Sequence, residues 1–189
     1  MSGPLLKLAF DRAAVWHRDQ RRKYPAANVP YVSHLAGVAA ILSRHGFREI
    51  VVAAGVLHDV LEDCPVTYAE LAKEFGEEVA TLVRHASEED KSLPWEERKR
   101  AYLERFPHKP WEAQAITLAD KIDNLLSIEV SALHFGDPWP MFKRGREDQL
   151  ARFRELVARA RALPEHGSHA LVGELEAVLA RVEALPATR

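Results

Sequence analysis

The amino-acid sequence predicts an all-α protein folded as a single helical bundle. Apolar residues recur at helical spacing along nearly the whole chain, and no segment alternates strictly between apolar and polar residues. The breaks between these segments are short and contain Gly or Pro. Because 189 residues, 47% of them hydrophobic, can bury one substantial core, we expect one domain over residues 1–189 with about eight to ten helices.

The first part of the chain predicts three helices and one long basic loop. Apolar residues at helical spacing predict helices over residues 4–20 and 32–45, and the Pro-containing segment 21–31 predicts the loop between them. Residues 48–62 begin with an apolar run whose β-branched residues would also suit a strand. The pattern continues to Leu61 without a turn signal, so we predict one continuous buried helix.

A capping box marks the next helix. Thr67 suits the N-cap position and Glu70 lies three residues later, so the two can satisfy each other's backbone N–H groups. The helix is predicted to end at Gly76, since glycine commonly terminates helices. Another helix follows over residues 77–86, and the polar stretch 86–93 predicts a loop.

The remaining predicted helices begin at residues that favour helix N-termini. Proline is well suited to the first turn of a helix because its missing N–H would have no partner there, so Pro94 and Pro110 are predicted to open helices. Ser168 is a plausible N-cap for the last helix. The predicted helices of this part of the chain cover residues 94–105, 110–133, 140–162 and 168–184.

Charge and cysteine content exclude several function classes. A net charge of −2 provides no overall positive field that would attract nucleic acid or an anionic membrane. No apolar run is long enough to span a bilayer and no signal-peptide core opens the chain, so we expect a cytoplasmic protein. Since Cys64 is the one cysteine among nine histidines, any metal site must use imidazole and carboxylate ligands.

The end of the most apolar predicted helix carries a cluster of polar side chains. His58, Asp59, Glu62 and Asp63 place one imidazole and three carboxylates within two helical turns. Carboxylates this close repel one another and favour a bound cation. The alternative is a frayed, solvated helix end, but the apolar run immediately before His58 argues against it.

Three other segments supply polar residues that such a site could use. Asp120, Asn124 and Ser127 fall at i, i+4 and i+7 on one stripe of a predicted helix, and the alternative is a stripe that faces water. His34 points toward the apolar face of its predicted helix, where the alternative is a hydrogen-bonded core histidine. The basic run 21–23 could reach the same pocket, although such runs usually lie on a solvated surface.

Together, His34, His58, Asp59 and Asp120 supply two nitrogen and two carboxylate ligands. This set suits Mn²⁺, Fe²⁺, Co²⁺ or Zn²⁺ with open positions for water and substrate. The order of His, then His-Asp, then a distant Asp resembles the pattern of the HD superfamily of metal-dependent phosphohydrolases.

Within that superfamily the chain looks most like the small alarmone hydrolases and the hydrolase domain of the bifunctional (p)ppGpp synthetase/hydrolases. This narrower resemblance covers the whole chain. The stretches that carry it include Gln20-Arg21-Arg22-Lys23, Pro30-Tyr31-Val32-Ser33-His34, Leu57-His58-Asp59-Val60-Leu61-Glu62-Asp63-Cys64, Lys91-Ser92-Leu93-Pro94 and Leu118-Ala119-Asp120-Lys121-Ile122-Asp123-Asn124-Leu125.

The resemblance implies an HD-type helical bundle that hydrolyses the 3′-pyrophosphate of guanosine tetra- and pentaphosphate to give pyrophosphate and GDP or GTP. The implied cofactor is Mn²⁺, with other divalent transition metals as alternatives. The implied metal ligands are His34, His58, Asp59 and Asp120. Glu62 and Asp63 match the pair that activates water and handles protons. The residues implied to bind the nucleotide are Arg22, Lys23, Lys121, Asn124 and Ser127.

The sequence departs from the family pattern in three places. Loop 24–29 is longer than usual, Leu35 stands where the family usually has Pro, and residues 85–88 read His-Ala-Ser-Glu. Two alternatives therefore stay open, an HD phosphohydrolase for another nucleotide and a non-catalytic nucleotide-binding HD module. The Glu62-Asp63 pair argues against the second, since binding alone needs no water-activating pair. The expected partner is a small nucleotide, and the choice between monomer and homo-oligomer stays open.

Overall fold

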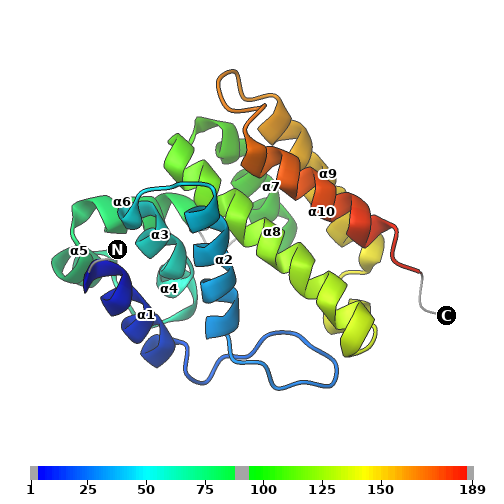
Figure 1. Ribbon diagram of the computed structural model, residues 1–189, viewed down its shortest axis with the longest axis horizontal. Helices are drawn as coiled ribbons and strands as arrows, with labels where there is room; N and C mark the ends of the chain where they lie inside the picture. Colours follow the sequence, from blue (N-terminus) through cyan, green and yellow to red (C-terminus); the bar gives the residue numbers. More distant parts are fainter. Residues whose placement is uncertain (1–3, 88–93, 187–189) are drawn as a thin grey trace.

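The computed structural model describes residues 4–87 and 94–186, which form helices joined by loops and turns (Figure 1). No β-strand occurs in this part of the chain, which confirms the all-α prediction. The described elements comprise ten α-helices and two short 3₁₀ helices. They are α1 (Pro4–Trp16), α2 (Val32–Arg44), α3 (Glu49–Val56), α4 (Val60–Asp63), α5 (Tyr68–Phe75), α6 (Glu77–Ala86), α7 (Trp95–Arg105), η1 (Phe106–His108), α8 (Trp111–His134), η2 (Trp139–Met141), α9 (Arg146–Arg161) and α10 (Ala170–Glu183).

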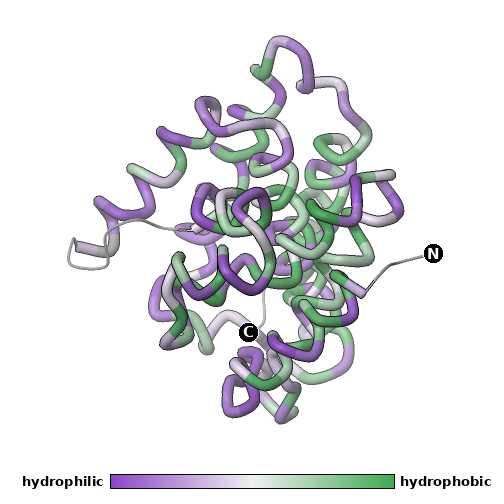
Figure 2. Tube along the Cα trace, turned by 90° about the vertical axis from the view of Figure 1, so that its left-hand side faces the viewer, coloured by the Kyte–Doolittle hydropathy of each residue, from purple (hydrophilic) through white to green (hydrophobic). Residues whose placement is uncertain are grey.

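The longest helix, α8, runs through the middle of the molecule. It packs against α2, α3 and α6 on one side and against α10 on the other, while α9 packs against α10 (Figure 1). Ile116, Leu118, Ile122 and Leu125 of α8 are completely buried. All ten α-helices contribute buried apolar residues to one core cluster, and hydrophilic segments lie toward the periphery (Figure 2). Most of these helices bury one face, as amphipathic helices of a globular protein do, whereas α3 is buried on all sides from Val51 to Val56.

Local signals account for several helix ends. Thr67 and Glu70 form the predicted capping box at the start of α5, and Gly76, at φ +88°, separates α5 from α6. Pro94 and Pro110 were predicted to be the first residues of their helices. Each occupies the N-cap position instead, so α7 and α8 begin one residue later. Ser168 was predicted to be the N-cap of α10, but it lies one residue before that position.

That position belongs to His169, whose Nδ1 accepts a hydrogen bond from the N–H of Leu171. Two predicted helices are also too long. The first helix ends at Trp16 rather than at residue 20, and the helix predicted over 140–162 is replaced by η2 and α9, with Gly145 at the N-cap of α9. Residues 91–93 of the predicted family motif lie outside the described ranges.

The prediction of one continuous helix over 48–62 is wrong, and the error has a functional consequence. Helix α3 ends at Val56 and α4 begins at Val60. In a continuous helix the Gly55 carbonyl would accept a hydrogen bond from the N–H of Asp59. It lies instead 2.8 Å from Nδ1 of His58, so the imidazole replaces the backbone and the chain turns.

The loop between α1 and α2 is closed at its base by backbone hydrogen bonds. The N–H of Arg22 donates to the carbonyl of Val29 (2.9 Å), and the N–H of Tyr31 donates to the carbonyl of Gln20 (3.1 Å). The basic segment and the start of α2 consequently lie side by side. None of the described helices is long and apolar enough to cross a membrane.

Candidate active site

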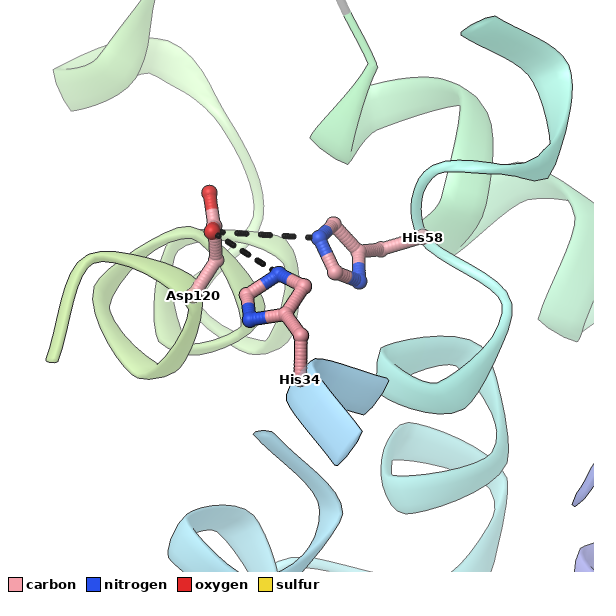
Figure 3. Close-up of side chains that lie close together, drawn as sticks. All are labelled: His34, His58 and Asp120. Atoms are coloured by element: carbon pink, nitrogen blue, oxygen red, sulfur yellow. Dashed lines mark ion pairs between the residues drawn. The ribbon is translucent and has the colours of Figure 1, made fainter. Parts of the chain in front are cut away.

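Three side chains from different parts of the chain converge in the interior. His34 comes from α2, His58 from the turn between α3 and α4, and Asp120 from α8 (Figure 3). One ligand atom from each lies within 4.8 Å of the other two. Oδ1 of Asp120 is 3.4 Å from Nε2 of His34 and 3.9 Å from Nε2 of His58. All three residues are buried, so this is a candidate metal site.

Hydrogen bonds behind the two imidazoles fix their orientation. Nδ1 of His34 lies 2.6 Å from Oδ2 of Asp123, and Nδ1 of His58 lies 2.8 Å from the Gly55 carbonyl oxygen. Because both acceptors need a proton from the ring, Nδ1 is the protonated nitrogen and Nε2 faces the cluster. Nε2 of His58 is buried and makes no hydrogen bond within the described part of the chain. Such an atom beside a carboxylate and a second imidazole fits a metal ligand.

Asp59, the fourth predicted ligand, lies beside this cluster but is not a member of the tight group. Its Oδ2 is 3.0 Å from Nε2 of His58 and 3.8 Å from Nε2 of His34. The hydroxyl of Tyr31 donates a hydrogen bond to the same oxygen. Tyr31 thereby holds the carboxylate toward the imidazoles.

The carboxylates around His58 favour positive charge at this point. Burial by itself lowers the pKa of His58, but the Asp59 carboxylate more than offsets this effect and raises the pKa to about 9. Burial by itself raises the pKa of Asp120, yet the Lys121 ammonium and the His34 ring hold it well below its usual range. The cluster therefore favours positive charge beside Nε2 of His58, and a divalent cation there would supply it.

A cavity of about 720 Å³ opens onto this cluster, which is a usual size for a small-molecule site. His58, Asp59 and Asp120 line it, and so do Glu62 and Asp63. The side chain of Asp63 accepts a hydrogen bond from Nε2 of Gln20 at 2.9 Å. The structure therefore brings the predicted catalytic pair to the same cavity as the metal cluster.

The five predicted nucleotide-binding residues also line this cavity. Nη2 of Arg22 donates to Oδ1 of Asn124 (2.8 Å) and to Oγ of Ser127 (3.0 Å), so the basic loop meets the polar stripe of α8. Nζ of Lys121 lies 2.5 Å from Oδ2 of Asp120. Lys23 is exposed, and its ammonium lies 5.5 Å from the centre of the Phe142 ring.

Sequence reasoning missed the residues that orient these groups. Asp123 was a detectable candidate because it lies three residues after Asp120, about one helical turn along α8. A side chain at Gly37 would collide with it, since an added Cβ would lie 1.8 Å from Oδ1 of Asp123. Tyr31 and Gln20 gave no signal beyond their place in the family motifs.

Two departures from the family pattern lie at the cavity. Ala86 lines it, and Oγ of the neighbouring Ser87 is 3.3 Å from the carbonyl oxygen of His58, so this segment supports the metal cluster from behind. Glu88 lies outside the described residues. From the long loop, Tyr24 lines the cavity and makes an edge-to-face contact with Phe135 at 5.3 Å.

Comparisons with known proteins agree on one family. Residues 9–134 match the family described as HD domain. The chain is 40% identical over 127 residues to guanosine-3′,5′-bis(diphosphate) 3′-pyrophosphohydrolase MESH1 of Xenopus tropicalis, a match that covers 66% of this chain and 70% of that protein. It is 45% identical over 119 residues to the Homo sapiens protein of the same name, with 62% and 65% covered.

Part of each relative's length therefore lies outside the match. A solved structure described as "A metazoan ortholog of SpoT hydrolyzes ppGpp and plays a role in starvation responses" aligns more completely. Its TM-score is 0.82 at 32% identity, over 96% of this chain and 97% of that one. The family match covers most of the described helices, and His34, His58 and Asp120 meet in one cluster with Asp59 beside it, so the chain belongs to the HD domain family.

Proposed function

We propose that this chain is a hydrolase that removes the 3′-pyrophosphate of guanosine tetra- and pentaphosphate, and that residues 1–189 act as one HD unit. Relatives carry this activity in their names, and one similar structure is described as hydrolysing ppGpp. The observation in this chain that carries the proposal is the environment of Nε2 of His58. It is buried, has no hydrogen-bond partner in the described residues, and faces a cavity that also holds Glu62 and Asp63.

The charge of the cavity matches such a substrate. Nine Lys and Arg side chains line it among the described residues, against four Asp and Glu. The four acidic residues are Asp59, Asp120 and the proposed catalytic pair, Glu62 and Asp63, so every other charged residue of the lining is a cation. Guanosine tetraphosphate carries two pyrophosphate groups, and cations that hold phosphate oxygens lower the cost of bringing so much negative charge together.

His34, His58 and Asp120 would hold the metal, with Asp59 as a fourth ligand. Their mixture of imidazole and carboxylate suits Mn²⁺, which we propose as the cofactor, as well as other divalent transition metals. When bound, the cation would polarise the phosphoryl oxygens and lower the pKa of water.

The side chains of the cavity would carry the remaining steps. Glu62 accepts a proton from the attacking water, whose oxygen bonds to the phosphorus next to the 3′-oxygen of the ribose. The bond between that phosphorus and the 3′-oxygen breaks, and the proton that Glu62 accepted passes by way of Asp63 to the 3′-oxygen. Arg22, placed against Asn124 and Ser127, orients the nucleotide, and Lys121 balances phosphate charge.

The proposal is tested by incubating the purified protein with Mn²⁺ and guanosine tetraphosphate and identifying the products. Pyrophosphate with GDP is the expected result. Hydrolysis of other nucleotides alone would instead support the general HD phosphohydrolase. Binding without turnover would support the non-catalytic module.

Glu62→Gln separates metal binding from catalysis. We expect kcat to fall about 10²- to 10⁴-fold because the general base is lost, with Mn²⁺ still bound in the wild-type ratio. Glu165→Gln, an identical change at an exposed position, should leave both quantities unaltered. Wild-type kcat in Glu62→Gln would show that this carboxylate does not take the proton of water.

A further inference from the structure

The side chain of Gln20 connects a proposed catalytic carboxylate to a buried histidine. Its Nε2 donates to Oδ2 of Asp63 at 2.9 Å, and its Oε1 lies 2.6 Å from Nδ1 of His17. The backbone of Gln20 is fixed on both sides. Its N–H donates to the carbonyl of His17 and its carbonyl accepts from the N–H of Tyr31. Gln20 therefore has a defined position from which to reach Asp63.

The chemistry of the two partners fixes the direction of the amide. An ionised carboxylate only accepts hydrogen bonds, so the NH₂ group of Gln20 must face Asp63. Its Oε1 then faces His17 and accepts the proton on Nδ1 of that ring. The two hydrogen bonds of Gln20 thus fix its amide between the buried imidazole of His17 and the exposed carboxylate of Asp63.

His17 can serve as the fixed end because its own position is constrained. The residue is 3% exposed, and its ring stacks on Tyr31 with 5.0 Å between the ring centres and 29° between the planes. Sγ of Cys64 lies 3.5 Å from Nδ1 and 3.6 Å from Nε2 of His17. The hydroxyl of Tyr31 in turn donates to Asp59. Tyr31, which stacks on His17, thus holds Asp59, and Gln20, which contacts the same ring, holds Asp63.

Asp63 is placed where the contact with Gln20 matters for its orientation. It is the last residue of α4, a helix of four residues, and it is exposed. An exposed carboxylate at a helix end samples several rotamers unless a neighbour selects one. A group that transfers protons must lie within hydrogen-bond distance of the reacting atom, so this freedom would reduce the rate.

We propose that Gln20, oriented by His17, is a positioning residue that holds Asp63 for proton transfer. The proposal rests on the proposed function, because it assigns Gln20 a part in that reaction. It predicts that loss of the amide donor lowers kcat and leaves KM and the bound Mn²⁺ unchanged. A contact that only helps the loop to fold would lower the thermal midpoint and leave kcat intact.

Gln20→Glu is the sharpest variant, because it keeps the shape and the oxygen that faces His17 but replaces the donor to Asp63 with an acceptor. With guanosine tetraphosphate and Mn²⁺ we expect kcat to fall about 10- to 100-fold at unchanged KM. Asn28→Asp makes the same amide-to-carboxylate change at an exposed residue of the same loop, outside the cavity lining, and should retain wild-type kcat. Wild-type kcat in Gln20→Glu would overturn the proposal.

A second set of variants tests the same contact without adding a negative charge beside Asp63, as Gln20→Glu does. Gln20→Met lacks both hydrogen bonds, and His17→Phe retains a ring to stack on Tyr31 but cannot orient the amide. If the two act in series, the double variant loses no more kcat than Gln20→Met alone, and additive losses would overturn the role of His17. In Gln20→Met, the ring Nδ1–H proton of His17 should also exchange faster with solvent, as measured by NMR.

The two proposals fail in different ways. If the wild-type protein binds guanosine tetraphosphate without hydrolysing it, the proposed function fails and the role of Gln20 in it fails as well. If the wild-type protein is active and Gln20→Glu and Gln20→Met retain its kcat, only the positioning role is overturned.

Discussion

Lys109 places an ammonium group in the interior, where the described part of the chain gives it no hydrogen-bond acceptor. Its Nζ is buried, has no partner among the described residues, and lies 4.1 Å from the centre of the Tyr102 ring. Burial, with Arg105 and Lys121 nearby, lowers the pKa of Lys109 to about 7. The ring offsets only part of the lost hydration of the cation. This residue therefore destabilises the folded protein whenever it is charged.

The effect predicts how stability depends on pH. Between about pH 7 and the ordinary lysine pKa of about 10.4, the unfolded chain binds a proton at Lys109 that the folded protein does not. The contribution of Lys109 to the free energy of unfolding therefore rises with pH across this window. Lys109→Met should remove that rise and stabilise the protein by about 1 kcal/mol at pH 7.

Urea denaturation at a series of pH values measures both effects. Lys99→Met, a matched change at a partly exposed lysine, serves as the control and should keep the wild-type pH dependence. An unchanged pH dependence in Lys109→Met would mean that the buried amine does not titrate in this window.

At the scale of helices, two glycines leave room for side chains of neighbouring helices. Gly37 of α2 leaves the space that Asp123 occupies, and Asp123 in turn orients His34 toward the metal cluster. Gly55 allows a similar approach of α3 to α2, since an added Cβ would lie 2.4 Å from Cδ1 of Leu42. These glycines bring the helices that carry the ligands close to one another.

Gly37→Ala should therefore weaken metal binding rather than simply strengthen a helix. Alanine in a helix interior is favoured over glycine by about 1 kcal/mol, but here the new methyl group must displace Asp123. We expect Mn²⁺ affinity, measured by calorimetric titration, to fall about 10- to 100-fold. Gly173→Ala, within α10 and with ordinary contact distances, should keep wild-type affinity. Equal affinities in the two variants would contradict the role assigned to Asp123.

Most of the helices could be predicted because each depends on its own amphipathic pattern and capping residues, as at Thr67. The turn at residues 57–59 could not, because it depends on a side chain bonding to a carbonyl three residues earlier in place of the backbone. The residues of the metal cluster were predictable from their types and order. The supports, Asp123 and Gln20, were not, since their roles depend on which distant segments meet when the helices pack.

For the molecule as a whole, the metal cluster lies where separate parts of the chain meet. His34, His58 and Asp120 come from segments that a bound cation would hold together. A ligand that binds only the folded state stabilises it by about 2.7 kcal/mol at one hundred times its Kd. We expect Mn²⁺ to raise the Tm and a chelator to reverse the shift.

Calorimetry of the chelated and Mn²⁺-loaded protein measures this shift. His34→Ala should abolish it, whereas His108→Ala, at an exposed residue, should retain it. A wild-type Tm that does not respond to Mn²⁺ would contradict metal binding at this cluster.

The distribution of charge also bears on how fast a substrate arrives. Cations outnumber acids along the cavity, yet the chain as a whole carries a net charge of −2, so the remainder of the protein is acidic. A polyanion that diffuses toward the protein is repelled by much of its surface and attracted to one opening. Productive encounters are thereby guided to the side of the molecule where the metal cluster lies. Added salt should slow these encounters, so kcat/KM falls with ionic strength while kcat stays nearly constant.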